Sequence, residues 1–168
     1  MTGTEVEPRM HDGAEVGHDI RSGRFDSIAV KETLAALASN GMWRSLWNIA
    51  DAMSREVSVL FDAEGRIWVD VGTAGKVRLA PPEGSMIPYR MWIHTHPWDA
   101  YWSATDLGTL AAHSSILKQA LVLGHDHLKH SGRPSERAPA VIEPDGPLSQ
   151  WTSEPNVTYA ELEAGHAD

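Results

Sequence analysis

The chain has 168 residues, of which 42% are hydrophobic, so one globular domain with a substantial core is expected. Its formal net charge of −9 disfavours binding to nucleic acid and to anionic membranes, whose phosphates carry the same sign of charge. The sequence has no cysteine, which excludes disulfides, thiolate metal ligands and cysteine catalysis, so any zinc ion would need nitrogen and oxygen ligands.

The two ends of the chain are polar and show no regular hydrophobic period. Residues 1–23 are expected to form a flexible acidic tail, and residues 153–168 a surface or disordered tail. The first tail has no apolar run of the secretory type, and no stretch of the chain approaches the roughly 20 apolar residues that span a membrane. We therefore expect one domain over 24–152 and a cytoplasmic location.

The first half of this domain has the pattern of helices followed by a hairpin. Residues 27–30 (SIAV) are expected to form a short strand, and residues 31–41 a short helix that ends at an Asn-Gly pair. Apolar side chains recur at three- and four-residue steps over 42–56, which predicts a second helix. The period then changes to two, so 56–62 and 67–72 are expected to pair as a β-hairpin.

Strands and a helix alternate in the second half. YRMWIHTH (89–96) and QALVLG (119–124) have the pattern of strands, and a helix is expected to begin at Ser103. Weaker strand patterns occur at 76–80 and 138–144. This mixture predicts an α/β fold, a three-layer sandwich in which a mixed β-sheet is flanked by helices.

One stretch has a spacing suited to a metal ion. His94 and His96 are two residues apart at the end of a predicted strand, so their side chains project from one face, about 7 Å apart. Asp106 lies three residues after Ser103, on the first turn of the predicted helix, where a carboxylate can reach back over the strand end. Three protein ligands leave one zinc position open, which is typical of a catalytic site. The sequence therefore predicts a zinc site at His94, His96 and Asp106.

Each part of this pattern also has a simpler interpretation. Ser103 and Asp106 have the spacing of a helix-capping pair, and a His-x-His pair on a strand is weak evidence for a metal by itself. The interpretations are compatible, since Ser103 can cap the helix and face the metal site as well.

The run His94-Thr95-His96-Pro97, followed by Ser103-Ala104-Thr105-Asp106, resembles the motif of the JAMM (MPN+) zinc metalloproteases, in particular their prokaryotic branch. The resemblance covers roughly residues 27–125 and implies a mixed sheet between helices, related in layout to the cytidine deaminases. It also implies hydrolysis of peptide or isopeptide bonds after ubiquitin and ubiquitin-like proteins. The sequence departs from the family pattern in two places. Six residues, rather than the commoner seven, separate His96 from Ser103, and the Gly-x-Leu-x-Gly run that many members carry is absent.

The resemblance further implies a glutamate upstream of the motif as the general base, and Ser103 as a donor to the oxyanion. In the family this glutamate opens an early strand just after the first long helix, and Glu56 has that position here. Glu32, within a predicted helix, and Glu64, at the predicted hairpin turn, are the alternatives.

The expected substrate is a ubiquitin-like or sulfur-carrier protein, or a conjugate of one. No nucleic-acid or membrane partner is expected, and the oligomeric state is left open. One alternative is a non-catalytic binding or scaffold module, as in relatives that have lost ligands. Another is a zinc amidase that acts on a small molecule. A deaminase is disfavoured because its Pro-Cys-x-x-Cys half cannot exist without cysteine.

Two further groups of residues have open roles. The loop between the ligands carries aromatic side chains that are expected either to contact substrate or to pack inward: Trp98, Tyr101 and Trp102. A second histidine cluster is expected to lie in a polar loop at a strand end, with an accessory metal site as the alternative: His125, His127 and His130.

Overall fold

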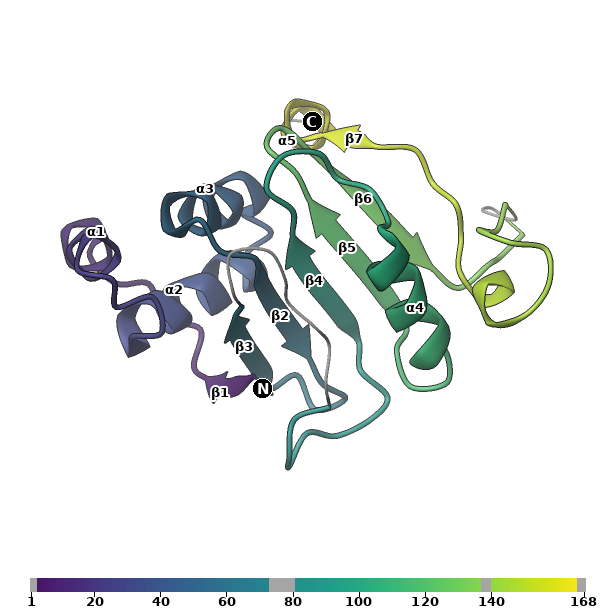
Figure 1. Cartoon of the computed structure of the whole chain (residues 1–168), viewed down its shortest axis with the longest axis horizontal. Helices are drawn as coiled ribbons and strands as arrows, with labels where there is room; N and C mark the ends of the chain where they lie inside the picture. Colours follow the sequence, from purple (N-terminus) through teal and green to yellow (C-terminus); the bar gives the residue numbers. More distant parts are fainter. Residues whose placement is uncertain (1–2, 73–80, 137–139, 166–168) are drawn as a thin grey trace.

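The computed structural model describes residues 3–72, 81–136 and 140–165 of the chain. Within these ranges, seven strands form one sheet in the order β1-β3-β2-β4-β5-β6-β7 (Figure 1). In chain order the strands are β1 (Thr4–Val6), β2 (Val57–Phe61), β3 (Ile67–Val71), β4 (Met91–Thr95), β5 (Gln119–Leu123), β6 (His127–Gly132) and β7 (Val157–Thr158). The pairing of β4 with β5 is parallel and the other pairings are antiparallel, so the sheet is mixed as predicted.

Helices flank this sheet (Figure 1). They are α1 (Gly13–Arg21), α2 (Ile28–Ser39), α3 (Trp43–Met53), α4 (Ala104–Ala112) and α5 (Tyr159–Gly165), with a short 3-10 helix η1 (Pro147–Gln150). One apolar core joins α2 and α3 to a sheet face that includes Val59 and Ile93. A second core joins α4 and the η1 segment to the opposite face, which includes Leu60 and Trp92. The α/β class is confirmed, and the two helical layers are compatible with the predicted sandwich.

The strand that carries the two site histidines is central in the sheet. β2 pairs with β4 with Ser58 opposite His94, and β5 pairs with β4 with Val122 opposite His94. α4 lies in the crossover connection between β4 and β5. Parallel strands need such a connection, whereas antiparallel neighbours can be joined by a short turn. Both the predicted hairpin, now β2 and β3, and the predicted helix after Ser103 are confirmed. The fold therefore brings the end of β4 and the start of α4 close together.

The N-terminal segment contains two elements, so the predicted flexible tail over 1–23 is wrong. β1 pairs with β3, and α1 begins after Asp12, whose carboxylate accepts the N–H of Ala14. Hydrophobic pattern could not reveal them. β1 is a three-residue strand held by main-chain pairing, and α1 buries only Val16 and Asp19, which is too little for an apolar stripe.

One further expectation is corrected, and a second is narrowed. Residues 27–30 open α2 rather than form a strand, because the Ser27 hydroxyl accepts the Val30 N–H at 3.2 Å and caps the helix. In 153–165, the described part of the predicted surface or disordered tail, β7 and α5 are present, so this part is a structured surface segment in which Tyr159 is buried.

The weaker strand patterns do not become strands in the part of the chain that the structure describes. In 140–144, the described part of 138–144, Val141 forms an isolated bridge with Thr152. The pattern at 76–80 lies outside the described residues. Among the helices of the described ranges, none has both the length and the apolar character needed to cross a bilayer.

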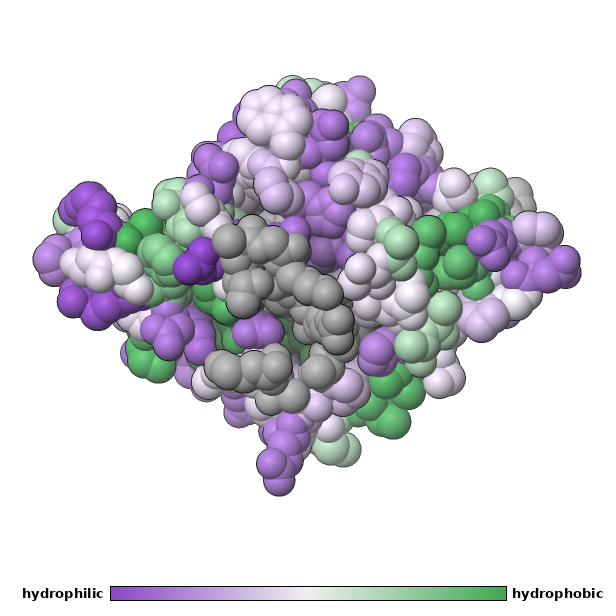
Figure 2. Space-filling model, viewed as in Figure 1, coloured by the Kyte–Doolittle hydropathy of each residue, from purple (hydrophilic) through white to green (hydrophobic). Residues whose placement is uncertain are grey.

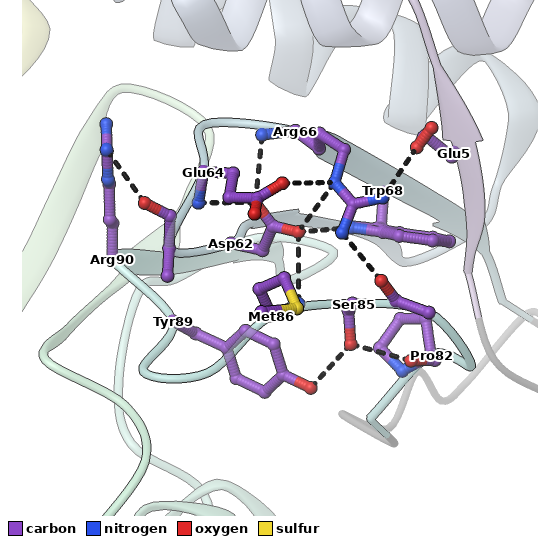
Figure 3. Close-up of polar contacts among 12 residues, drawn as sticks. Glu5, Asp62, Glu64, Arg66, Trp68, Pro82, Ser85, Met86, Tyr89 and Arg90 are labelled. Atoms are coloured by element: carbon purple, nitrogen blue, oxygen red, sulfur yellow. Dashed lines mark hydrogen bonds and ion pairs between the residues drawn. The ribbon is translucent and has the colours of Figure 1, made fainter.

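A buried carboxylate fastens the hairpin turn to the segment before β4 (Figure 3). Asp62 is fully buried and accepts the backbone N–H groups of Glu64, Arg66 and Met86. The Nε of Arg66 lies 3.2 Å from Asp62 Oδ2. Burial by itself raises the pKa of Asp62, but the backbone hydrogen bonds outweigh it and leave the pKa lowered. The bond to Met86 ties the segment that leads into β4 to the hairpin.

Asp62→Asn is expected to lower the free energy of unfolding at pH 7 by about 2 kcal/mol, because one neutral amide oxygen replaces two charged acceptors. Since the folded pKa of Asp62 is lowered, its contribution is complete above the ordinary value of about 3.9 and is lost as pH falls through the folded value. The difference between wild type and variant should therefore shrink in strong acid. Urea unfolding across pH measures both effects.

Glu64→Gln is the matched control for Asp62→Asn. Glu64 is exposed and lies 3.6 Å from Arg66 Nε, so its change should alter the unfolding free energy by less than about 0.5 kcal/mol. Equal effects of the two substitutions would contradict the role given to Asp62.

Candidate metal centre

The structure brings His94, His96 and Asp106 together at the end of β4. His94 Nε2 lies 3.1 Å from Asp106 Oδ1, and His96 Nε2 lies 2.9 Å from Asp106 Oδ2. One possible ligand atom of each residue lies within 4.8 Å of the other two. The three residues are buried, with exposed fractions of 1%, 6% and 5%. β4 supplies His94, the chain just after β4 supplies His96, and the first turn of α4 supplies the carboxylate.

The residues present fit a divalent metal ion. Both ring nitrogens of His94 are buried without a hydrogen-bond partner among the described residues, although Nε2 lies beside the Asp106 carboxylate. Buried polar atoms are nearly always paired, so the lack of other partners leaves His94 Nε2 available as a ligand atom beside Asp106. Imidazole and carboxylate are zinc ligands, and tetrahedral zinc separates such atoms by roughly 3.4 Å, close to the spacings found here. The donor set is thus of the right chemistry and size.

Asp106 also caps helix α4. Ser103 Oγ accepts the Asp106 N–H at 3.1 Å, and Asp106 Oδ2 accepts the Ser103 N–H at 3.0 Å. This capping box fixes the carboxylate on the first helical turn, with one oxygen beside each histidine. The capping interpretation and the ligand interpretation are therefore compatible in one structure.

Contacts from both sheet faces orient the two histidines. Trp92 stacks on His94 with ring centroids 4.2 Å apart, and Trp92 Nε1 donates to Ser58 Oγ at 2.8 Å. From the α3 side, Trp47 Nε1 donates to the carbonyl oxygen of His96 at 2.8 Å. The His94 ring is thus held by stacking, and the main chain at His96 by a hydrogen bond. The sequence analysis did not assign Trp92 or Ser58 to the site, although strand alternation places Trp92 on the face of His94.

The electrostatics of the site favour an ionised Asp106. Burial by itself raises the pKa of Asp106, but its polar contacts with His94 and His96 and the Ser103 N–H outweigh burial. The pKa of Asp106 therefore lies well below its usual range. The site presents a carboxylate, which is the form that binds metal ions.

Glu56 immediately precedes β2, the strand that pairs with β4 beside His94. Ser58 pairs with His94 in the antiparallel ladder, and continuing this register by two residues places Glu56 opposite His96. Alternation along the strand puts Glu56 on the same face as Ser58 and His94. Its side chain is half-buried, and its backbone carbonyl accepts the N–H of Gly72 at 2.8 Å.

The two alternative glutamates lie elsewhere. Glu32 is buried on α2, and its carboxylate lies 2.8 Å from Nε2 of His11. Glu64 is exposed at the hairpin turn, which follows the far end of β2 from the metal ligands. Of the three candidates, Glu56 is the one that the sheet register places on the face of the site.

The loop over 97–102 presents aromatic side chains beside the ligands. Trp98 and Tyr101 are 61% and 55% exposed, and the Tyr101 ring lies 4.7 Å from the His96 ring. Trp102 instead packs against the core under α4. Of these aromatics, Trp102 packs inward, whereas Trp98 and Tyr101 are exposed. Figure 2 shows that the surface at the top of the view, where this loop lies, is mostly hydrophilic or intermediate in hydropathy.

Two surface cavities have been located in the described structure. One, of about 150 Å³, lies behind the end of β4 and is lined by residues that include His96, Trp47 and Arg55. The other, of about 260 Å³, lies between the start of α3 and α5, and no metal ligand lines it. Both are smaller than the roughly 300–1,000 Å³ that is usual for small-molecule sites.

The second histidine cluster does not form the polar loop that was expected. His127 begins β6 and His130 continues it, while His125 precedes the strand. Ligand atoms of His125, Asp126 and His127 lie within 4.8 Å of one another, which is close enough for an ion. However, His127 Nε2 accepts the Ala100 N–H at 3.0 Å, and Nδ1 lies 2.7 Å from Asp126 Oδ1. With the proton on Nδ1 and the lone pair of Nε2 in use, His127 has no free ligand atom.

Gly124 is required where the loop crosses the end of β5. A Cβ atom at this position would lie 2.7 Å from the Trp98 oxygen and 2.8 Å from the Ala100 nitrogen. Gly124→Ala is therefore expected to displace the loop and lower the free energy of unfolding by about 2 kcal/mol. Gly108→Ala, within α4, is the control. There an added Cβ meets nothing within 4 Å, and stability should rise by roughly 0.5–1 kcal/mol. Equal unfolding midpoints in urea would contradict this.

The site brings together two histidines and one carboxylate that could hold a metal ion. Comparison of the chain with protein-family models, with curated proteins and with solved structures gives no match. The His94–His96–Asp106 group is therefore the feature from which a function is inferred.

Proposed function

We propose that the chain is a zinc-dependent metallopeptidase of the JAMM type that hydrolyses a peptide or isopeptide bond. The observation that carries the proposal is the convergence of His94, His96 and Asp106, with Glu56 placed on the same face by the sheet register. The chain order also supports it, because a helix, the glutamate, the His-x-His strand and the Ser-x-x-Asp helix follow in the order that the resemblance implies.

His94, His96 and Asp106 would hold the metal ion. Zinc in such a site supplies Lewis acidity, which makes water a stronger acid and polarises the carbonyl of the scissile bond. Three protein ligands leave room in the coordination shell for the reacting groups.

Glu56 acts as the general base in this proposal. Its carboxylate accepts a proton from the attacking water and delivers it to the nitrogen of the leaving amine. This role requires hydrogen-bond reach to the water and not ligation of the ion. The half-buried position opposite His96 supports it.

Ser103 donates a hydrogen bond to the carbonyl oxygen as charge develops there. Its Oγ accepts the Asp106 N–H, and that bond leaves the hydroxyl proton free to donate. Loss of such a donor typically lowers the rate by about 10²–10³-fold.

The proposed substrate is a ubiquitin-like or sulfur-carrier protein, or its conjugate. The exposed ring of Tyr101 beside His96, with the exposed Trp98 on the same loop, suits an extended polypeptide. The presence of every ligand together with Glu56 favours an enzyme over a scaffold module.

The test is cleavage of a ubiquitin-like protein that carries a peptide extension after its C-terminal glycine. The zinc-loaded chain is expected to release the extension at that bond, as read by intact-mass spectrometry. Chelation should abolish release, and added zinc should restore it. Cleavage that survives chelation would contradict the metal mechanism. Hydrolysis of small amides without cleavage of the protein would contradict the substrate class.

A further inference from the structure

We propose that the turn between β5 and β6 holds the 97–102 loop over the metal ligands, and that His127 is a positioning residue for this loop. The inference rests on the proposed function only for the statement that the loop borders a metal site. It assigns a role to the second histidine cluster other than binding a second ion.

The turn contacts the loop at two consecutive points. The His125 N–H donates to the Trp98 oxygen at 2.8 Å, and the two rings stack at 3.9 Å with planes 3° apart. Two residues further along the loop, the Ala100 N–H donates to His127 Nε2 at 3.0 Å. Ala100 is 2% exposed, so water cannot easily replace this acceptor. His127 therefore satisfies a buried donor in the middle of the loop.

Asp126 fixes which nitrogen of His127 can accept. Its Oδ1 lies 2.7 Å from His127 Nδ1 and 3.3 Å from His125 Nε2, so the proton of His127 is held on Nδ1. The lone pair is then on Nε2, where the Ala100 N–H needs it. The turn is itself anchored, because Tyr159 donates its N–H to the Asp126 carbonyl and its hydroxyl to the Gly124 carbonyl.

The position of Ala100 matters because the loop is short. Six residues connect His96 to Ser103, and Ala100 lies in the second half of them. The end of β4 fixes His96, whose N–H donates to the Leu123 carbonyl at 2.9 Å. The other end leads directly into Ser103 and Asp106, so release of Ala100 would loosen the placement of Asp106 relative to the histidines.

Cobalt titration of the full chain tests the proposal, with amide hydrogen exchange at Ala100 as a second readout. His127→Leu is expected to weaken Co²⁺ binding about tenfold or more and to speed exchange at Ala100. His127→Gln should recover most of both, because its amide oxygen can accept the same N–H. His130→Leu is the matched control. His130 lies on the same strand but contacts Glu154 and Gln119, so Co²⁺ affinity should be unchanged.

Three results would overturn the proposal. One is a folded His127→Leu variant with the Co²⁺ affinity of the wild type. The second is an equal loss in the Leu and Gln variants. The third is a second Co²⁺ ion per chain that remains after His94→Ala.

Asp126→Ala keeps the test decisive if His127→Leu does not fold. Asp126 is exposed, so its replacement should be tolerated, and exchange at Ala100 should accelerate severalfold as His127 loses its fixed tautomer. Unchanged exchange in this variant would overturn the role of Asp126. These readouts involve no cleavage, so failure of the wild type to cleave would count against the proposed function alone. If the chain binds no Co²⁺, exchange at Ala100 still decides the role of His127.

Discussion

Glu56→Gln is expected to lower the rate of peptide-bond hydrolysis by about 10²–10⁴-fold without releasing the metal ion. Glutamine keeps the size of the side chain and its place at the start of β2, but its neutral amide cannot take a proton from water. The possible ligand atoms come from His94, His96 and Asp106, so the metal content should not change. Initial cleavage rates of the fusion substrate and elemental analysis, on the same samples, measure both quantities.

Glu64→Gln is the matched control, because it makes the same chemical change beyond the opposite end of the same strand. Its rate should lie within about twofold of the wild type, as expected for a surface substitution. Glu32→Gln should alter stability rather than rate, because Glu32 lies on α2 and its carboxylate contacts His11 rather than the metal site. Full activity of Glu56→Gln would exclude Glu56 as the base, and loss of zinc from it would make Glu56 a ligand.

Asp106→Asn is expected to weaken zinc binding by about 10²-fold or more and to leave helix α4 in place. Loss of a residue that hydrogen-bonds to a metal ligand typically weakens metal binding 10–100-fold. Loss of a charged ligand itself should weaken binding by at least about 100-fold. The asparagine oxygen can still accept the Ser103 N–H, so most of the capping box remains. Zinc titration against a competing chelator and urea unfolding of the apo chain separate the two effects.

Ser103→Ala serves as the control for capping, because it is expected to lower stability and leave zinc affinity nearly unchanged. It removes the acceptor of the Asp106 N–H, which should lower the free energy of unfolding by about 1 kcal/mol. Zinc affinity should change little, because Ser103 is not a ligand. If Asp106→Asn bound zinc as tightly as the wild type, capping would be the whole role of Asp106.

The sequence predicted those elements whose side-chain pattern is repeated over several residues. The helix over Trp43–Met53 buries Leu46, Trp47, Ala50 and Met53 on one face, and apolar residues recur at every second position in both strands of the β2–β3 hairpin. The metal ligands could be proposed for a related reason. Strand alternation fixes the direction of His94 and His96, and the Ser-x-x-Asp spacing fixes Asp106 on the first helical turn.

Elements that depend on distant contacts could not be predicted in this way. β1 is stabilised by its pairing with the edge of β3. β6 is stabilised by its pairing with β5, in which Leu121 and Leu123 lie opposite residues of β6. The histidines in and before β6 therefore looked like a polar loop. Their contacts with the 97–102 loop are between residues 27 positions apart, which no local pattern encodes. The choice of Glu56 over Glu32 rests on chain order, and the register of β2 against β4 is a second, independent observation that favours it.

Zinc content, measured by elemental analysis on wild-type and His94→Ala chains purified side by side, tests the central claim most directly. We predict one zinc ion per wild-type chain and almost none in the variant, with both chains folded. A wild-type chain that takes up no zinc even when zinc is supplied, or a variant that keeps it, would contradict the proposed metal centre.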